Sequence, residues 1–406
     1  MTMSRRLRAI SLFTGVGGMD FGFEAAGFET AVALELDPLA CDTIRANREW
    51  PLLEGDIHSF SSEQILAAGG LQPGEADVLF GGPPCQPFSK SGYWLKGDSR
   101  RLNDPRSSTL AAYLRVLGDV LPKSFVLENV HGLAFKGKDE GLRFILDGIA
   151  AVNRQRGANY SVHWAKLNAA DYGVPQMRER VVLVGSRDGQ PFVFPRPTHS
   201  ASDGADVERW RTTWDAIGDL PAQPNEVGLR MGGRWADLLP SIPEGENYLW
   251  HTPRGGGLPL FGWRTRYWSF LLKLAKDRPA WTIQAQPGSA IGPFHWANRR
   301  LTTAELCRLQ TFPDDLVFRC GRTGIQKMLG NAVPSLLAEV LGRSIRTQFL
   351  GSSMVGPLTL LPPRRRGRPP AEPVRPVEAK YLDLVGNHAA HPGEGLGNRA
   401  RVRKAA

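Results

Sequence analysis

The sequence contains one cysteine that is well placed to act as a nucleophile. Cys85 stands between Pro84 and Pro87, in a loop that begins with two glycines directly after the apolar segment 77–80. A lone cysteine usually packs as a small hydrophobic residue, but a proline-rich loop at a strand end is a poor place for core packing. A thiolate in such a loop can attack an electron-poor carbon if nearby positive charge favours its ionisation.

Three charged residues further along the chain could assist such a reaction. Glu128 lies in the apolar segment 125–130, where it is either a helix cap or a catalytic acid. Arg178 and Arg180 stand two residues apart, so a strand would present both on one face. The alternative for this arginine pair is a solvated charged face.

A glycine-rich turn near the N-terminus suggests a bound cofactor. Gly15, Gly17 and Gly18 separate an expected strand from an expected helix, where a ligand can approach the backbone. The dinucleotide-binding pattern requires glycine at position 20, which is Asp20, so a plain tight turn is the alternative.

Two acidic residues follow this turn, one at the end of the next expected strand and one at the end of the third unit of the chain. A carboxylate at Glu35 suits the hydroxyl groups of a ribose, and Asp56 could accept a hydrogen bond from an adenine amino group. The turn and the two acids together favour an adenosine cofactor without a pyrophosphate, which fits S-adenosylmethionine better than NAD.

The elements that must position these residues alternate between apolar strands and amphipathic helices. This alternation predicts a mostly parallel sheet covered on both faces, an α/β, Rossmann-like fold. The expected strands are 8–13, 30–35, 77–80, 124–127, 161–167 and 180–185, and the expected helices are 18–26, 38–48, 108–120 and 139–152.

The composition changes after residue 188. Residues 189–298 are rich in Pro, Gly and Trp, include eight of the eleven tryptophans and show weak periodicity. We therefore expect a catalytic domain at 1–188, an irregular second domain at 189–298, and a return to the catalytic domain at 299–350 with helices at 302–310 and 335–349. Residues 351–406 are dominated by Pro, Arg and Gly, which predicts a basic, disordered tail.

Composition and charge restrict the class of protein. The chain has 406 residues, of which 42% are hydrophobic and 22% charged, as in ordinary globular proteins. No run approaches the roughly 20 apolar residues of a membrane span, and the N-terminus does not resemble a signal peptide. The net charge of the chain is +10, and residues 362–406 contribute ten basic and four acidic residues to it. Such a charge indicates a polyanionic partner. A basic enzyme without such a partner is the alternative. The four cysteines stand too far apart for a disulfide framework or a zinc site, which predicts a reducing cytoplasm and no metal.

The motifs and their order resemble those of the bacterial DNA (cytosine-5)-methyltransferases. The resemblance implies an S-adenosylmethionine-dependent enzyme that methylates carbon 5 of a flipped cytosine in a specific double-stranded DNA sequence, protecting that DNA from a cognate restriction endonuclease. The matching segments, spread over residues 8–345, are 13–18, 35–37, 55–57, 82–89, 128–130, 176–180, 300–313 and 330–334.

The resemblance also implies catalytic roles. Cys85 corresponds to the nucleophile that adds to carbon 6 of cytosine, and Glu128 to the acid that binds ring nitrogen 3 and the exocyclic amine. Arg180 corresponds to the residue that contacts the ring carbonyl oxygen. Arg178 would support this site from behind or bind a phosphate.

For the cofactor, the resemblance places Phe13 on adenine, Glu35 on the ribose and Asp56 on the adenine amine. Asn331 would reach the pocket from near the C-terminus, so the final helix should pack beside the first strand. The other expected pocket residues are Gly15, Gly17, Gly18, Leu36, Ile57, Pro84 and Leu110.

Contacts with DNA are expected from three regions. Residues 86–96, including Ser89, Ser91 and Gly92, resemble the mobile loop that closes over the flipped base. The second domain stands in the place of the target-recognition domain, and Thr282 resembles a residue that contacts DNA near that base. Its candidate base-reading residues, which could equally be phosphate contacts or solvated charges, are Arg230, Arg234, Arg254, Arg264, Arg266 and Lys273.

In the tail, residues 364–370 resemble an AT-hook, a segment that lies in the minor groove of A/T-rich DNA. Arg366 and Arg368 would then point along the floor of that groove. A sequence-blind basic tail is the alternative, and either would add affinity that weakens with salt.

Two other functions compete with this interpretation. A tRNA cytosine methyltransferase would carry a Cys-Phe-Thr signature, but no cysteine lies between Cys85 and Cys307. A catalytically dead DNA-binding homologue is disfavoured because Cys85, Glu128 and Arg180 are all present. We expect a monomer without an obligate protein partner or a membrane contact, acting in the bacterial cytoplasm in association with the nucleoid.

Overall fold

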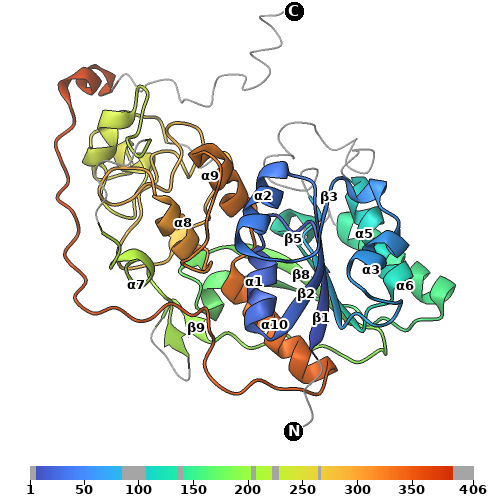
Figure 1. Cartoon of the computed structure of the whole chain (residues 1–406). Helices are drawn as coiled ribbons and strands as arrows, with labels where there is room; N and C mark the ends of the chain where they lie inside the picture. The colour runs from blue at the N-terminus through green and yellow to red at the C-terminus, as the bar shows by residue number, and fades with distance from the viewer. Residues whose placement is uncertain are drawn as a thin grey trace, which may run out of the picture.

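The computed structural model contains a seven-stranded, mostly parallel sheet at the centre of its first lobe (Figure 1). The structure describes residues 6–84, 107–134, 140–202, 207–221, 228–263 and 267–386. Four neighbouring strand pairs are parallel, and only β8 runs antiparallel to its neighbours. In spatial order the strands are β3 (Leu52–Glu54), β2 (Phe28–Glu35), β1 (Leu7–Leu12), β4 (Val78–Gly81), β5 (Ser124–Val130), β8 (Glu179–Ser186) and β6 (His163–Asn168).

Helices cover both faces of this sheet. Successive side chains of a strand point to opposite faces, so a strand can contribute to two hydrophobic cores. On β1, Ile10 and Leu12 point into one hydrophobic core and Ala9 into the other. The first core lies under α3 (Ser62–Ala68), α5 (Ser107–Val120) and α6 (Glu140–Arg156). The second core lies under α1 (Gly18–Ala25) and α10 (Ser335–Phe349). The predicted α/β, Rossmann-like fold is therefore confirmed.

The last helix packs beside the first strand, as expected from Asn331. Helices α1 and α10 approach so closely at Gly22 that an added Cβ would lie 2.2 Å from the carbonyl oxygen of Ser335. Only glycine permits so close an approach at position 22, and Gly342 on α10 likewise lies against Ala26.

The remaining elements are short. Helix α2 (Pro38–Asn47) begins at the N-cap Asp37, and α8 (Thr303–Leu309) at a capping box formed by Thr302 and Glu305. The others in the first lobe are α9 (Arg322–Asn331), β7 (Gln176–Met177) and the 3-10 turns η1 (Ile57–Ser59), η4 (His131–Ala134) and η5 (Ala169–Tyr172). Every element expected from the sequence is present with ends displaced by four residues or fewer, whereas α3, α9 and β3 were not expected.

The described residues of 199–298 have little regular structure, and we call them the second lobe. Phe192 and Phe194 pack in the core under α10 and belong to the first lobe. The second lobe's own core is aromatic and includes Trp235, Tyr248, Phe261, Phe270 and Phe294. The ordered pieces are β9 (His199–Ser200), β10 (Glu208–Arg209), α7 (Thr213–Ile217), η6 (Ala236–Ser241), η7 (Tyr248–His251) and β11 (Ala280–Trp281).

The prediction of a disordered tail is wrong for residues 351–386, which we call the strap. The strap runs from α10 past β9 and along the outer side of the second lobe to η8 (Ala379–Leu384) (Figure 1). It is extended rather than periodic, and a few apolar side chains anchor it: Leu358, Leu360 and Leu361 at one end, and Val377, Tyr381 and Leu384 at the other.

No helix among the described residues is long and apolar enough to cross a membrane.

Candidate active site and cofactor pocket

The carboxyl ends of β4 and β5 bring the cysteine loop and Glu128 together. Gly81 pairs with Leu127, so the next residues, Gly82 and Glu128, are neighbours. A Cβ on Gly82 would lie 2.8 Å from Oε2 of Glu128. The loop that leads to Cys85 therefore passes directly against this carboxyl group, and glycine leaves room for it.

Glu128 is paired with Arg180 from the adjacent strand. Because β5 and β8 are antiparallel, with Val130 opposite Arg180, the two charged side chains meet diagonally. Nε of Arg180 lies 2.6 Å from Oε1 of Glu128, and the two side chains are only 12% and 11% exposed. Burial raises the pKa of Glu128, although the charges of Arg180 and Arg178 and the Arg180 hydrogen bond oppose this shift.

Arg178 does not share a strand face with Arg180. It lies between β7 and β8, is fully buried, and donates to the backbone oxygens of Ile283 (3.4 Å) and Gly330 (2.8 Å). A buried guanidinium cannot reach a phosphate, so that interpretation is wrong. Arg178 instead ties the segments next to Thr282 and Asn331 to the edge of the sheet.

Thr282 lies beside this arginine segment. Strand β11 pairs with β7, and Oγ1 of Thr282 donates to the carbonyl oxygen of Met177 at 2.7 Å. Thr282 is exposed, so it remains accessible to a large ligand.

Asn129 is a site residue to which the sequence analysis assigned no role. Its side chain is buried, and Nδ2 donates to the carbonyl oxygen of Pro83 at 3.2 Å. It thereby fixes the backbone two residues before Cys85. Cys85 itself, and Ser89, Ser91 and Gly92, lie outside the described residues.

The glycine turn follows β1 and is bonded to Glu35. Oε2 of Glu35 accepts from the backbone N–H of Gly15 (2.6 Å), and Oε1 accepts from that of Asp37 (2.8 Å). Gly15 has a φ of 57°, and nothing lies within 4 Å of where its Cβ would be. Protein atoms crowd the other two glycines: Trp50 lies against Gly17, and the carbonyl oxygen of Val333 against Gly18. Open space for a ligand therefore adjoins Gly15.

The apolar pocket residues lie next to this turn. Ile57 and Leu110 are buried in one core cluster, and Phe13 packs against that cluster while remaining partly exposed. Asp56 is exposed, and its Oδ1 caps η1 by accepting from the N–H of His58 (2.9 Å). Leu36, Pro84 and Asn331 are also exposed.

These groups fit an adenosine ligand. A partly exposed aromatic ring, two carboxylates at adjacent strand ends and an open turn are the groups that an adenine and a ribose require. A carboxylate has about four lone-pair sites, so Glu35 can accept ribose hydroxyls beside its two backbone donors. Within the described part of the chain, no cluster of His, Cys, Asp and Glu could hold a metal ion.

Comparison with known proteins identifies the family of the chain. Residues 7–347 match the family model described as C-5 cytosine-specific DNA methylase. The chain belongs to this family. It is a DNA (cytosine-5)-methyltransferase of the bacterial restriction-modification type, which confirms the resemblance carried by the motifs.

Curated relatives match this methyltransferase over most of their length. The Type II methyltransferase M.SacI of Streptomyces achromogenes is 40% identical over 376 residues, which cover 86% of this chain and 94% of that protein. The Type II methyltransferase M1.HphI of Haemophilus parahaemolyticus is 32% identical over 351 residues, covering 84% and 86%.

Solved structures share the fold. A DNA modification methyltransferase encoded within an E. coli prophage superposes with a TM-score of 0.59 at 22% identity, over 85% of this chain and 100% of that one. DNMT2 from Spodoptera frugiperda gives a TM-score of 0.58 at 15% identity, over 84% and 99%. At these identities the likeness concerns architecture alone.

Proposed function

We propose that this methyltransferase transfers the methyl group of S-adenosylmethionine to carbon 5 of one cytosine within a specific double-stranded DNA sequence, with Cys85 as the nucleophile. The observation that carries the proposal is the buried Glu128–Arg180 pair, which lies against Gly82 at the start of the cysteine loop. A proton donor held there is what activation of a pyrimidine ring requires.

The first-lobe residues would bind the methyl donor. S-adenosylmethionine supplies an electrophilic methyl group when bound. Phe13 would pack on adenine, Glu35 would accept from the ribose hydroxyls, and Asp56 would accept from the adenine amine. The open side of Gly15 leaves space for the ligand next to the backbone.

Cys85 and Glu128 would activate the base together. The Cys85 thiolate adds to carbon 6 while Glu128 donates a proton to ring nitrogen 3, so carbon 5 becomes electron-rich enough to accept the methyl group. Burial favours the protonated form of Glu128. Solvent water then takes up the carbon 5 proton, Cys85 departs as the thiolate, and ring nitrogen 3 returns its proton to Glu128, which together restore the aromatic ring.

Arg180 would orient Glu128 through its Nε and direct its remaining N–H groups toward the carbonyl oxygen of the base. A cytosine inside a duplex cannot reach these groups, so the base must be flipped out. Thr282 is exposed beside the arginine segment and would contact the DNA there. The second lobe would read the sequence.

The biological role that we infer is protection of host DNA against a cognate endonuclease. We also propose that the enzyme acts as a monomer in the cytoplasm, on nucleoid DNA. Arg366 and Arg368 belong to the strap, and their contact with the minor groove stays a prediction.

Bisulfite sequencing tests the proposed function. The gene is expressed in a host without cytosine methylation, and the expected result is complete conversion resistance at one cytosine of one short recurring sequence. Cys85→Ser is the control and should give none while retaining affinity for S-adenosylmethionine. A folded wild-type protein that leaves every recurring DNA sequence unmethylated would contradict the proposal. Methylation confined to tRNA would contradict it too and would show that the substrate is tRNA.

A further inference from the structure

The strap connects two hydrophobic cores that belong to different lobes. Leu358, Leu360 and Leu361 pack against the first-lobe core under α10. Tyr381, with Val377 and Leu384, joins the aromatic core of the second lobe. The strap begins after residue 347, where the family match ends.

The near end of the strap is fixed to α10. The carboxylate of Glu339, which is fully buried, accepts from the backbone N–H groups of Thr359 (2.7 Å) and Leu360 (2.9 Å). Arg343 donates to the carbonyl oxygen of Pro357 at 2.7 Å and pairs with Glu339. These bonds hold the first residues of the strap to the catalytic lobe.

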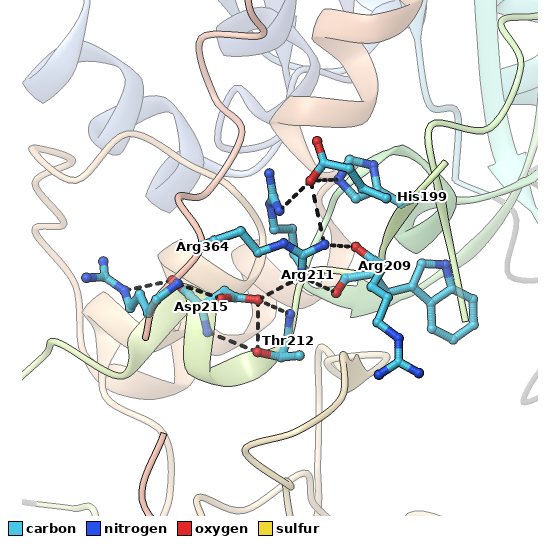
Figure 2. Close-up of polar contacts among 9 residues, drawn as sticks. His199, Arg209, Arg211, Thr212, Asp215 and Arg364 are labelled. Carbon is cyan, nitrogen blue, oxygen red and sulfur yellow. Dashed lines mark hydrogen bonds and ion pairs between the residues drawn. The ribbon is translucent and has the colours of Figure 1, made fainter. Parts of the chain in front are cut away.

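The middle of the strap contacts α7 through a cluster that we call the clasp, formed by Arg364, Arg365 and Asp215. Figure 2 shows Arg364 beside Asp215. Arg364 donates to the carbonyl oxygen of Trp210 (2.8 Å) and pairs with Asp215 (3.4 Å). Arg365 donates from its backbone N–H to Oδ1 of Asp215 and from Nε to the backbone oxygen of Asp215, both at 2.8 Å.

Asp215 is the central residue of the clasp. It is 4% exposed, and its Oδ2 also accepts from the backbone N–H of Thr212 at 2.8 Å, which caps α7. The clasp therefore couples the strap directly to the start of α7, near the beginning of the second lobe.

The far end of the strap is docked by aromatic stacking. The ring of Tyr381 stacks on Trp235 with centroids 5.9 Å apart and an angle of 14° between the planes, and its hydroxyl donates to the carbonyl oxygen of Arg234 at 2.6 Å. On the way, Glu372 pairs with the buried Lys276 at 3.1 Å.

Between these anchors the strap spans a cleft rather than filling it. The cleft, of about 430 Å³, is lined by strap residues Arg364, Arg365 and Arg368 and by Trp214, Arg278 and Pro279 of the second lobe. The clasp and Tyr381 are therefore two of the contacts that join the strap to the second lobe, beside those of Lys276 with Glu372 and of Lys380 with Asp237. The two lobes also share a core that includes Phe21 and Ile283.

We propose that the strap holds the second lobe at the angle that DNA binding requires, and that Arg365 and Tyr381 are positioning residues for this purpose. A lobe that spends only a fraction of its time in the competent orientation binds DNA more weakly by that same fraction. Glu128 and the candidate residues for the methyl donor lie in the first lobe and make none of the strap contacts described above.

Two matched pairs of full-length variants separate this role from a general effect of charge. Arg365→Ala and Arg375→Ala each remove one positive charge from the strap, but Arg375 is exposed and its side chain has no hydrogen bond or ion pair within the described part of the chain. Tyr381→Ala removes the stacked ring without changing charge, and Tyr381→Phe keeps the ring while losing its hydrogen bond.

We expect Arg365→Ala and Tyr381→Ala to raise the KM for target DNA by about tenfold. The kcat at saturating DNA and the dissociation constant of S-adenosylmethionine should stay within about twofold of the wild type, and Arg375→Ala and Tyr381→Phe should stay within about twofold throughout. Equal KM changes for Arg365→Ala and Arg375→Ala would overturn the proposal in favour of simple electrostatics. A parallel fall in kcat and cofactor affinity would overturn it in favour of general loss of the fold.

Discussion

Two opposing effects act on the pKa of Glu128. Burial disfavours the carboxylate, whereas the Arg180 guanidinium 2.6 Å away favours it, and burial is the larger of the two, so the pKa is raised. A carboxyl group with a raised pKa and a fixed orientation keeps its proton to a higher pH than an ordinary glutamate, so it is better suited to donate that proton.

Replacing Glu128 with glutamine should reveal this shift through stability. Because the pKa is higher in the folded protein than its ordinary value of 4.5, the folded state binds more protons above pH 4.5. The stability of the wild type relative to Glu128→Gln should therefore fall as the pH rises from 4.5 through the raised pKa, and then level off. Thermal melting of both proteins from about pH 5 to about pH 9 checks this, and a constant difference would show that Glu128 titrates normally.

Gly82→Ala should disturb catalysis with little effect elsewhere. The new methyl group would approach Oε2 of Glu128 at 2.8 Å and push the carboxyl group away from its site. We expect kcat to fall by about 10²-fold, comparable to the loss of a positioned proton donor, with unchanged affinity for S-adenosylmethionine by calorimetry. An unaltered kcat would mean that the position of Glu128 against the cysteine loop is not important.

At the scale of single residues, the sequence indicates which side chains belong to the site more reliably than which of them are in contact. Glu128 and Arg180 were singled out, but they stand 52 positions apart, and their pairing depends on the antiparallel register of β5 and β8. For Arg178 the resemblance leaves two roles open, support of the site from behind and phosphate binding, and only its burial decides against the second. The backbone oxygens that make its burial possible come from residues 283 and 330, which spacing cannot predict.

At the scale of elements, apolar periodicity predicted the strands and helices that carry the motifs. The missed elements have weaker signals. Strand β3 has only three residues, and α9 contains two glycines and few apolar side chains. Both are stabilised by neighbours, β2 for the strand and the core that contains Ile325 and Leu329 for the helix.

The packing of α1 against α10 gives a test at this scale. Gly→Ala in an exposed helix interior normally stabilises by about 1 kcal/mol. At Gly22 the added methyl group would meet backbone at Ser335, so we expect destabilisation of about 1–3 kcal/mol in denaturant titrations. Gly232→Ala is the control, because nothing lies within 4 Å of its Cβ position. A stabilised Gly22→Ala protein would show that the two helices are not in close contact.

At the scale of the whole molecule, the methyltransferase consists of two lobes and a strap. The tail was expected to be disordered because it is rich in Pro, Arg and Gly. The prediction failed for 351–386 because an extended segment can dock through a few separated side chains, such as Leu361 and Tyr381, which leave no periodic pattern.

Charge and docking can be separated along the C-terminal segment. Residues 358–386 contain six basic and three acidic residues, and residues 387–406 contain four basic and one acidic, so each carries a net charge of +3. Removal of 387–406 should weaken DNA binding at low salt and flatten its salt dependence, by about 0.9 in the log–log slope for each phosphate that the protein no longer neutralises, while leaving the melting temperature unchanged. Binding isotherms at several salt concentrations check this, and an unchanged slope would show that these residues do not touch DNA.

The central claim, that Cys85 of this methyltransferase attacks cytosine in DNA, is tested most directly by trapping the covalent complex. Once the target sequence is known, a duplex carrying 5-fluorocytosine at the methylated position is incubated with the enzyme and S-adenosylmethionine. The fluorine cannot leave as a proton, so the account predicts a denaturant-stable protein–DNA adduct that mass spectrometry maps to Cys85 and that Cys85→Ser abolishes. Full methylation of ordinary DNA by Cys85→Ser, or an adduct on any other residue, would contradict it.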